Sequence, residues 1–322
     1  MFKIGVYTAE SVNRSKSLFG RSRTVSLGLL RPGAQPIDGE FFQGVIRGLR
    51  LSDRVYRTTF PHRFASLDPQ VNELIVGRLA SSAAITVHDW AASDVLAAVE
   101  WAGTLKNVFP RLSFCASDKL FGLIEAFRDD AESYIFEPDG TPLQYTSAPF
   151  VIALREPEAA VYPVNRWLAR RASRRAEGFR SIVPQLKWSS VTDDSVIERD
   201  GWQFRQILLI HPVSQRYLRE NPWFGVNIHS VFDPTTERIN VIRSMNIFNT
   251  AYFSSEQLTR GVRAVFSSLC LGGLWIVGKT DVFIGTDAQV TIWEARERGF
   301  APLLRIGRGS EIDDLVQRTF RE

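Results

Sequence analysis

Two aspartates, each at the end of a short apolar run, have the residue type and spacing of a ligand-binding site. The first run ends at Asp89 and passes through small residues, among them Ala91 and Ser93, to Asp94 and a segment with helical apolar spacing at 95–101. The pattern predicts a strand, a tight loop and a helix. In open α/β sheets ligands bind beyond the carboxyl ends of strands, where small residues let a ligand approach the backbone. We therefore expect Asp89 at a strand end, with the small residues as a pocket floor.

The second aspartate repeats this arrangement. The run 112–117 ends at Asp118, which lies 29 residues after Asp89. A carboxylate at the tip of a second strand, about 20 or more residues beyond the first loop, suits a nucleotide ribose because it accepts hydrogen bonds from both hydroxyls. Two later apolar segments, 239–248 and 269–278, extend the pattern, and the second contains a glycine pair.

The order of these parts resembles the class I S-adenosylmethionine-dependent methyltransferases. In that family a first strand ends in an acid and a glycine-rich loop, and a second strand ends in a ribose-binding acid. A fourth strand carries a D/N-hydrophobic run, and an L-x-P-G-G turn precedes the fifth. The resemblance covers residues 84–316, and 241–278 looks particularly like the chemotaxis-receptor methyltransferases. The matching positions are Asp89 to Asp94, Asp118, Ile239 to Phe248 and Leu271 to Gly278.

The first loop departs from the family pattern. It reads D-W-A-A-S-D where the family has D-x-G-x-G-x-G, so Ala91 and Ser93 stand at glycine positions. Alanine is small enough for close approach but disfavours a positive φ. We therefore expect either ordinary backbone angles or strain in this loop. The departure also keeps an alternative open, a non-catalytic S-adenosylmethionine-binding or scaffold protein of the same fold.

The resemblance implies an α/β fold with a seven-stranded Rossmann-like methyltransferase sheet, an antiparallel last hairpin, a helical N-terminal lead-in and an inserted substrate or lid region. It divides the chain into an arm and lead-in at 1–80 and an S-adenosylmethionine-binding domain at 81–322, with an insertion at 130–203. Periodicity and capping signals add the local expectations. These are helices over 40–50, from Asp68, over 120–128, 213–221 and 254–269, a hairpin turn at Asp139-Gly140, a third strand within 224–234, and a turn at Gly272-Gly273.

The implied activity is direct SN2 transfer of a methyl group from S-adenosylmethionine to a small-molecule acceptor. Phe232 and Asp233 fall where the family contacts adenine, and Met245 falls beside the methionine part of the cofactor. Arg243 and Asn246 are the candidates for orienting the acceptor, just past the tip of the central strand. His211 and His229 are possible bases, although a structural role fits each better. The implied cofactor-binding residues are Asp89, Trp90, Ala91, Ser93, Asp94, Asp118, Phe232, Asp233 and Met245.

Composition bounds the remaining classes. The 322 residues are 44% hydrophobic, which suffices for a large core. No apolar run approaches the about 18 to 20 residues of a membrane span, so we expect a soluble, cytoplasmic protein with no membrane partner. Cys115 and Cys270 lie in strand-like contexts and are expected to be buried free thiols. A homodimer is compatible with the Ser/Arg-rich arm within 1–35.

Arginines concentrate between Arg166 and Arg180, while the net charge is only +4. Such a segment could form a surface for nucleic acid or an anionic substrate. We favour a solvated helix face, with Trp167, Leu168, Ala172 and Phe179 turned inward, and do not expect a nucleic-acid partner.

Overall fold

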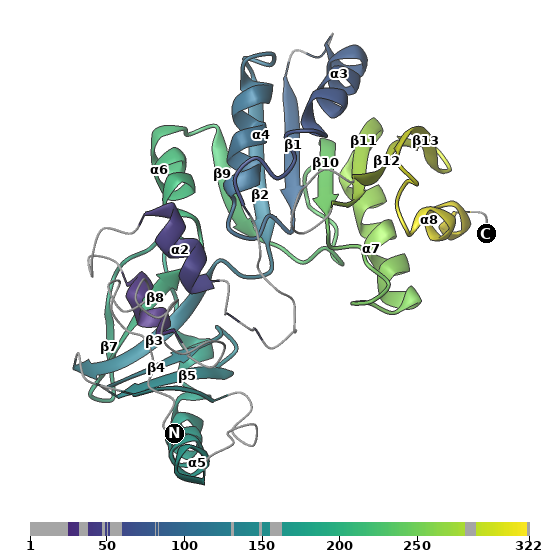
Figure 1. The fold of residues 1–322 in the computed structure, drawn as a ribbon. Coiled ribbons are helices and arrows are strands. Elements are labelled where there is room, and N and C mark those ends of the chain that lie inside the picture. Colours follow the sequence, from purple (N-terminus) through teal and green to yellow (C-terminus); the bar gives the residue numbers. More distant parts are fainter. Residues whose placement is uncertain are drawn as a thin grey trace. The chain divides into compact units, whose positions relative to one another are not determined.

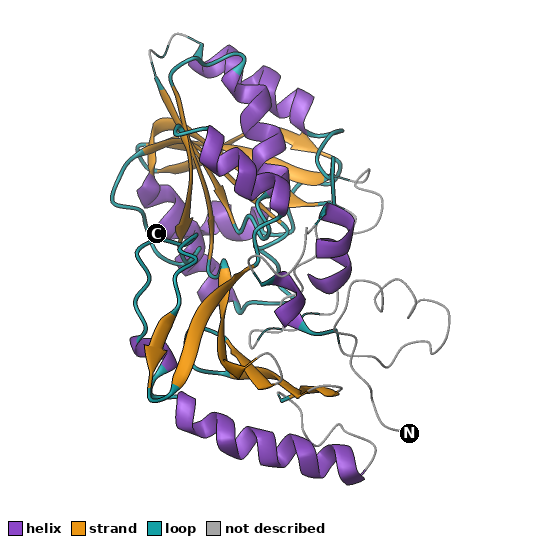
Figure 2. Ribbon diagram, turned by 90° about the vertical axis from the view of Figure 1, so that its left-hand side faces the viewer, coloured by secondary structure: helices purple, strands orange, loops and turns teal. Residues whose placement is uncertain are grey.

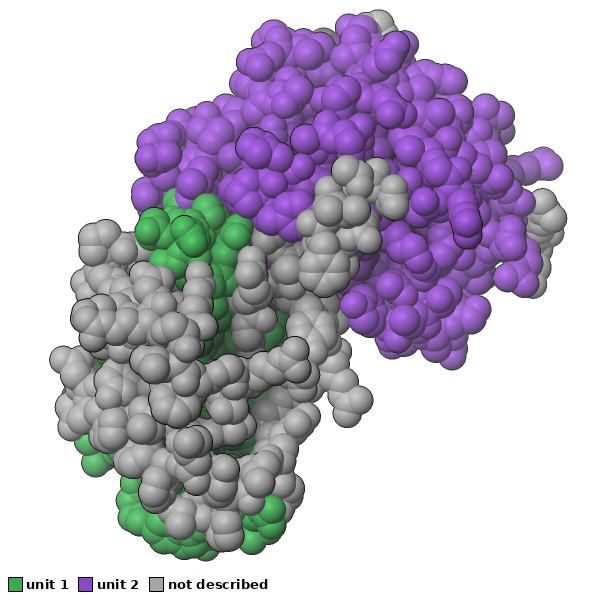
Figure 3. All heavy atoms as spheres, in the orientation of Figure 1, with its two compact units in different colours: residues 1–58, 121–212 green, residues 59–120, 213–322 purple. Residues whose placement is uncertain are grey.

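The computed structural model describes residues 25–31, 38–46, 49, 51, 60–80, 82, 84–129, 132–147, 150–154, 163–280 and 288–320. The chain divides into two compact units, coloured separately in Figure 3. Unit 1 comprises residues 1–58 and 121–212, and unit 2 comprises residues 59–120 and 213–322. The boundaries expected from the sequence lie at 80/81 and at the ends of 130–203. The proposed N-terminal arm falls largely outside the described residues.

Unit 2 is a mixed α/β unit (Figure 1). Its elements are α3 (Asp68–Leu79), β1 (Ile85–Trp90), α4 (Leu96–Lys106), β2 (Leu112–Asp118), α6 (Pro212–Glu220, which begins at the boundary), β9 (Phe224–Ile228), β10 (Ile239–Met245), α7 (Ser255–Ser268), β11 (Leu269–Lys279), β12 (Gln289–Arg296), β13 (Gly299–Ile306) and α8 (Asp313–Thr319). The strands form one seven-stranded sheet in the order β13-β12-β11-β10-β1-β2-β9. Neighbours from β9 to β11 pair in parallel, and β12 pairs antiparallel with both β11 and β13. The expected seven-stranded sheet and its antiparallel last hairpin are confirmed.

Side chains of β1 alternate between the two faces of this sheet. His88 and Trp90 face α7, and Trp90 belongs to the apolar cluster that includes Ile242 and Trp275. Asp89 points the opposite way, toward α3 and α4, where Trp101 is fully buried. Both faces of the parallel strands are therefore covered near β1 and β10, as parallel sheets require.

The predicted starts of α7 and α3 had different outcomes. The predicted capping box of α7 is present, since Ser254 and Gln257 exchange side-chain to backbone hydrogen bonds. In α3 the prediction of Asp68 as N-cap was wrong, because Leu67 occupies that position and Asp68 is already helical. The Asp68 carboxylate instead contacts Arg243.

The glycine pair Gly272-Gly273 lies inside β11 and not in a turn before it. Gly272 has a φ of 75°, and the pairing of β10 with β11 shifts register between Ile239 and Val241. An added Cβ at Gly273 would come within 2.8 Å of the Cys270 carbonyl oxygen. The pair therefore forms an irregularity that bends one long strand, which explains why its signal was mistaken for a turn.

Unit 1 is built on a six-stranded sheet in the order β6-β5-β4-β3-β8-β7. Each neighbouring pair is antiparallel. Helix α5 packs along it, as Figure 2 shows. The elements are η1 (Leu27–Leu30), α2 (Gly39–Ile46), β3 (Gly122–Asp129), β4 (Glu132–Phe136), β5 (Pro142–Ser147), β6 (Phe150–Ala153), α5 (Pro163–Ala176), η3 (Glu177–Phe179), η4 (Val183–Gln185), β7 (Ile197–Arg199) and β8 (Trp202–Leu208).

The expected helix over 120–128 was wrong, because this segment is strand β3. Its residues have acceptable helix propensity, but both edges of the strand are occupied, by β4 on one side and β8 on the other. Pairing on both sides overrides a weak local preference. The predicted hairpin turn is confirmed between β4 and β5, where Gly140 has a φ of 85°.

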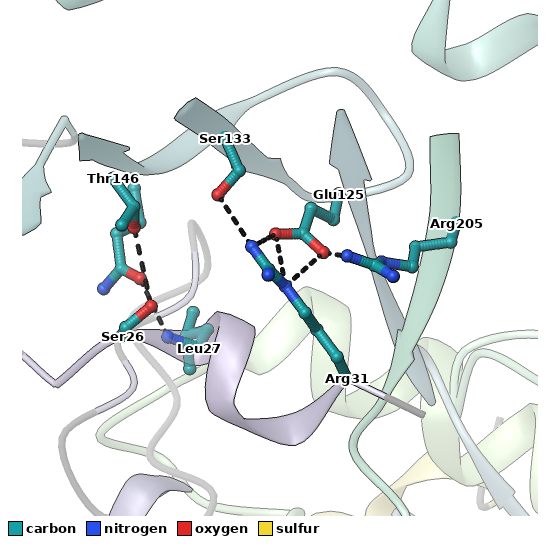
Figure 4. A network of polar contacts seen from close by, with 8 residues as sticks. Ser26, Leu27, Arg31, Glu125, Ser133, Thr146 and Arg205 are labelled. Carbon is teal, nitrogen blue, oxygen red and sulfur yellow. Dashed lines mark hydrogen bonds and ion pairs between the residues drawn. The ribbon is translucent and has the colours of Figure 1, made fainter. Parts of the chain in front are cut away.

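A buried carboxylate attaches η1 to the sheet of unit 1 (Figure 4). The Glu125 side chain is 0% exposed and accepts hydrogen bonds from Arg31 at 2.6 to 3.0 Å and from Arg205 at 2.8 Å. The side-chain amide of Gln144 accepts from Leu27 N–H at 2.8 Å and donates to the Val25 carbonyl. Two arginines around one acid leave no uncompensated negative charge, which such burial requires.

Candidate functional site

The loop between β1 and α4 is the most unusual backbone in unit 2. Ala91, Ser93 and Val95 have φ values of 61°, 55° and 72°, in the left-handed region that favours glycine. Each such residue costs roughly 1–2 kcal/mol. The loop thus adopts the conformation of a glycine-rich turn without glycine, which is the strained of the two outcomes that its sequence allowed. Val95 is fully buried, so packing holds it there.

Asp118, at the tip of β2, fastens this loop. Its Oδ2 accepts a hydrogen bond from Ser93 N–H at 2.9 Å, and its Oδ1 accepts from Leu120 N–H at 3.2 Å. The Ala92 N–H donates to the Ser117 carbonyl at 2.9 Å. The loop and the tip of β2 are therefore held as one assembly.

Asp94 is buried and fixes the start of α4. Its carboxylate accepts from Leu96 N–H at 3.1 Å. Its charge also acts on the guanidinium of Arg63, although burial is the larger influence and lowers the pKa of Arg63. Asp94 therefore stabilises the C-terminal end of the loop, where α4 begins.

Asp89 is held by Arg243 inside the sheet. The guanidinium donates from Nε and Nη2 to the two carboxylate oxygens at 3.0 and 2.6 Å, and also to the Ala97 carbonyl at 3.2 Å. Arg243 is 0% exposed, and its charge lies 4.1 Å from the centre of the Trp101 ring. The pair connects β1, β10 and α4 directly beneath the strained loop.

Arg243 also contacts Asp68 of α3, through Nη1 at 3.2 Å. Burial, followed by the charges of Asp89 and Glu100, raises the pKa of Asp68 to about 6 against the opposing effect of Arg243. One cation thus faces two carboxylates, of which Asp89 has the bidentate geometry. Arg243 was expected just past the end of the central strand, which was wrong, because β10 continues to Met245 and Arg243 lies inside the strand.

The tip of β10 lies at Asn246, which has a φ of 62°. Its N–H donates to the Gly278 carbonyl at 2.8 Å, and its side-chain oxygen accepts from Thr280 N–H at 3.0 Å. Met245, one residue earlier, is buried. A small recess opens at this point, lined by Asn246, Phe248, Asn249, Gly278, Lys279, Ser310 and Glu311.

Phe232 and Asp233 lie on the face of the sheet that α7 covers. The Phe232 ring packs edge-on against Phe253, with centroids 4.9 Å apart, and Asp233 pairs with Arg260 of α7 at 2.5 Å. Asp233 therefore belongs to one face of the sheet and Asp89 to the other. Of the aspartates predicted at strand tips, Asp89, Asp118 and Asp233, only Asp118 forms a hydrogen bond with the strained loop.

Trp90 and His229, which the sequence singled out, lie with His88 and Ser117, which it did not, in a group of buried polar side chains on the α7 face. Several atoms of this group have no hydrogen-bond partner in the described part of the chain, among them His88 Nδ1, Trp90 Nε1, Ser117 Oγ and His229 Nε2. Trp90 and Ser117 are register partners on β1 and β2, and the rings of Trp90 and His229 are 4.6 Å apart. The available signal was alternation, since His88 and Trp90 flank Asp89 and must face away from it.

Both histidines of this group are neutral near pH 7. Burial, followed by the neighbouring His229, lowers the pKa of His88 to about 4. Burial also lowers the pKa of His229, with Asp233 opposing the shift. A neutral imidazole offers one donor and one acceptor, so each ring can still form a hydrogen bond with a ligand.

Three further features of the described residues concern metal-binding groups, membrane-spanning helices and free cysteines. No group of three or more His, Cys, Asp or Glu side chains there is placed to hold a metal ion. Among the same residues, no helix has the length and apolarity needed to cross a membrane. Cys115 and Cys270 are free thiols, as expected, but both are only partly buried.

Comparisons with known proteins gave matches only among solved structures. No protein-family profile matches the sequence, and no curated protein does. One similar structure is the citrinin polyketide synthase CMeT domain, with 9% sequence identity and a TM-score of 0.33. A second is a putative S-adenosyl-L-methionine-dependent methyltransferase from Methanococcus maripaludis, with 11% identity and a TM-score of 0.31. A third is the sugar N-methyltransferase KedS8 from Streptoalloteichus, with 11% identity and a TM-score of 0.32.

Coverage differs among the three. The alignments include 67%, 76% and 79% of this chain, and 35%, 65% and 76% of the respective structures. The chain therefore spans about a third of the first structure and just under two thirds of the second. TM-scores near 0.3 do not establish a shared fold, and the identities establish no shared activity.

Proposed function

We propose that this protein is an S-adenosylmethionine-dependent methyltransferase that acts on a small-molecule acceptor. One observation carries the proposal: the strained, glycine-like loop after β1 is fastened to the acid at the tip of β2. Strain of this kind concentrates at binding and catalytic sites, because otherwise it only lowers stability. Three of the five residues 91–95 have left-handed backbone angles and none of them is glycine, so a role in ligand binding would explain why this strain is kept.

The loop also lies where an open sheet binds ligands. The chain leaves β1 for β2 on one side, and the later strand β10 pairs on the other side of β1, so the strand order reverses between them. Ligands of open α/β sheets bind outside the carboxyl ends of strands at such a switch point. The tips of β1, β2 and β10 surround this position.

The residues at these tips fit an adenosyl group. A carboxylate can accept about four hydrogen bonds, so the two backbone bonds of Asp118 are compatible with a ribose. The unpartnered donors and acceptors of Trp90, Ser117 and His229 suit a heteroaromatic ring with polar edges. Ala91 and Ser93 would allow the ligand to approach the loop backbone closely.

The chemistry needs little from the protein beyond alignment. S-adenosylmethionine, when bound, supplies a methyl group that is already electrophilic because it is attached to a sulfonium. The strained loop would orient the cofactor, and Asn246 at the tip of β10 would orient the acceptor. Arg243 would not contact the ligand; it would be a positioning residue that holds the loop through its hydrogen bonds to Asp89 and to the Ala97 carbonyl. His229, neutral near pH 7, could accept a proton from the acceptor.

Calorimetric titration tests the proposal. S-adenosylmethionine and S-adenosylhomocysteine should each bind the full-length protein at one site, and Asp118→Ala should weaken both at least tenfold, because it removes a ribose acceptor and releases the loop. Asp233→Asn is the matched control, since its carboxylate is exposed and faces α7. Absence of binding, or equal losses in the two variants, would refute this site. Formation of S-adenosylhomocysteine with small amine and hydroxyl acceptors then tests turnover.

A further inference from the structure

Helix α5 of unit 1 presents a tryptophan among arginines on its outer surface. Trp167, Arg170, Arg171 and Arg174 follow one another at helical spacings of three, one and three residues, which places them on one stripe. All four are exposed, and Trp167 is 54% exposed. The guanidinium of Arg171 lies 5.5 Å from the centre of the Trp167 ring.

The outward position of Trp167 corrects the expectation that it would face the core. The positions that pack on the sheet are Ala169, Ala172 and Ala176, all nearly or fully buried. Small residues let the helix approach the sheet closely, and Phe179 beyond the helix fills the aromatic cluster instead. The largest side chain of α5 is thereby left more than half exposed, outside the core of unit 1.

The charge of this helix is one-sided. Its 14 residues include five arginines and no acid. Arg175 pairs with Glu132 at 3.3 Å, whereas no described carboxylate lies within ion-pair distance of Arg171 or Arg174. Unit 1 holds 21 of the 39 Lys and Arg residues and 17 of the 35 Asp and Glu residues, which leaves 18 of each in unit 2. The net positive charge of the chain therefore resides in unit 1.

We propose that this stripe binds single-stranded nucleic acid. Arginines neutralise phosphates, and an exposed aromatic ring stacks on an unpaired base of any identity. From residue 167 to residue 174 the helix rises about 10 Å, which matches a few nucleotides of an extended strand. The proposal is independent of methyl transfer, because every residue that carries it belongs to unit 1.

Two other polyanions fit the surface less well. A lipid surface is bound by helices that insert an apolar face, but the apolar face of α5 is buried against its own sheet. A base-paired duplex keeps its bases stacked inside, so it would use the arginines but not the Trp167 ring. A contribution of Trp167 to binding therefore distinguishes a single-stranded nucleic acid from a lipid surface and from a base-paired duplex.

The test uses the full-length protein and a fluorescein-labelled 12-nucleotide oligouridylate, followed by anisotropy at several salt concentrations. Trp167→Ala should weaken binding about tenfold, within the range of one base stack, and Trp167→Phe should restore most of it. Arg171→Gln with Arg174→Gln should weaken binding and lower the salt slope by about 1.4, or 0.7 for each charge.

The matched control is Arg175→Gln with Arg180→Gln. It removes the same charge from the same segment, but both arginines are already paired, with Glu132 and Glu177. It should weaken binding less than twofold, and circular dichroism should show all variants folded. Equal effects of the two double variants, an unchanged affinity of Trp167→Ala, or preferential binding of duplex or of phosphatidylserine vesicles would overturn the proposal.

Discussion

Replacing Arg243 by methionine tests the internal support of the candidate site. The change removes the partner of Asp89, whose side chain is 7% exposed and receives two hydrogen bonds at 2.6 and 3.0 Å. Leaving a buried charge unpaired costs about 3–5 kcal/mol. We therefore expect Arg243→Met to reduce the stability of unit 2 by about 4 kcal/mol, which corresponds to roughly a thousandfold change in an opening equilibrium.

Hydrogen exchange measured by mass spectrometry is the suitable assay, because a chain with two compact units need not unfold in one step. Peptides that cover β1 and β10 should lose protection in Arg243→Met. Asp89→Asn combined with Arg243→Met should restore more than half of the loss, since the Asp89 charge is then gone and the Asp68 carboxyl, whose pKa is already raised to about 6, is readily protonated without Arg243.

Arg260→Met is the matched control for this experiment. It breaks an ion pair in the same unit, with Asp233, but both side chains are more than half exposed. Exposed pairs contribute about 0–1 kcal/mol, so protection should change little. A loss below about 1 kcal/mol in Arg243→Met, or no recovery in the double variant, would refute the assigned role of the buried pair.

Three further predictions concern single positions. The pKa of Asp68 in the folded protein, about 6, lies above its ordinary value, so the stability that this group provides is present at low pH and is lost as pH rises through 6. The free energy of unfolding of unit 2 should therefore increase by about 1 kcal/mol from pH 7 to pH 5. In urea unfolding curves, Asp68→Asn should abolish that increase. Gly278→Ala should lower the thermal midpoint strongly, because its Cβ would collide with the Gln289 carbonyl and separate β11 from β12. Ser254→Ala should cost about 1 kcal/mol by removing the cap of α7, seen as faster exchange in its first turn.

The fold of unit 2 was largely predictable because its signals are local. Apolar runs ending in acids gave β1 and β2, and a capping box gave the start of α7. The sheet of unit 1 was predicted only at its β4–β5 hairpin, because its other strands are defined by pairing between distant segments. β3 is the clearest case, since its local pattern fits a helix and only β4 and β8 make it a strand.

The site was predictable in sequence position but not in side-chain direction. Asp89 and Trp90 are adjacent in the chain, yet they face opposite sides of the sheet, and only the identity of their partners decides which face meets a ligand. Arg243 was expected at a strand tip because nothing in the sequence marks where β10 ends. The strain at Ala91, Ser93 and Val95 depends on packing and on Asp118, which no single sequence reveals.

A crystal structure of the protein with S-adenosylhomocysteine tests the central claim most directly. The account predicts the adenosyl group at the carboxyl edge of the sheet, with its ribose hydroxyls within hydrogen-bond distance of Asp118 and its body against the 91–94 loop. A ligand bound elsewhere, or a loop that keeps its left-handed residues while the ligand makes no contact with it, would contradict the account.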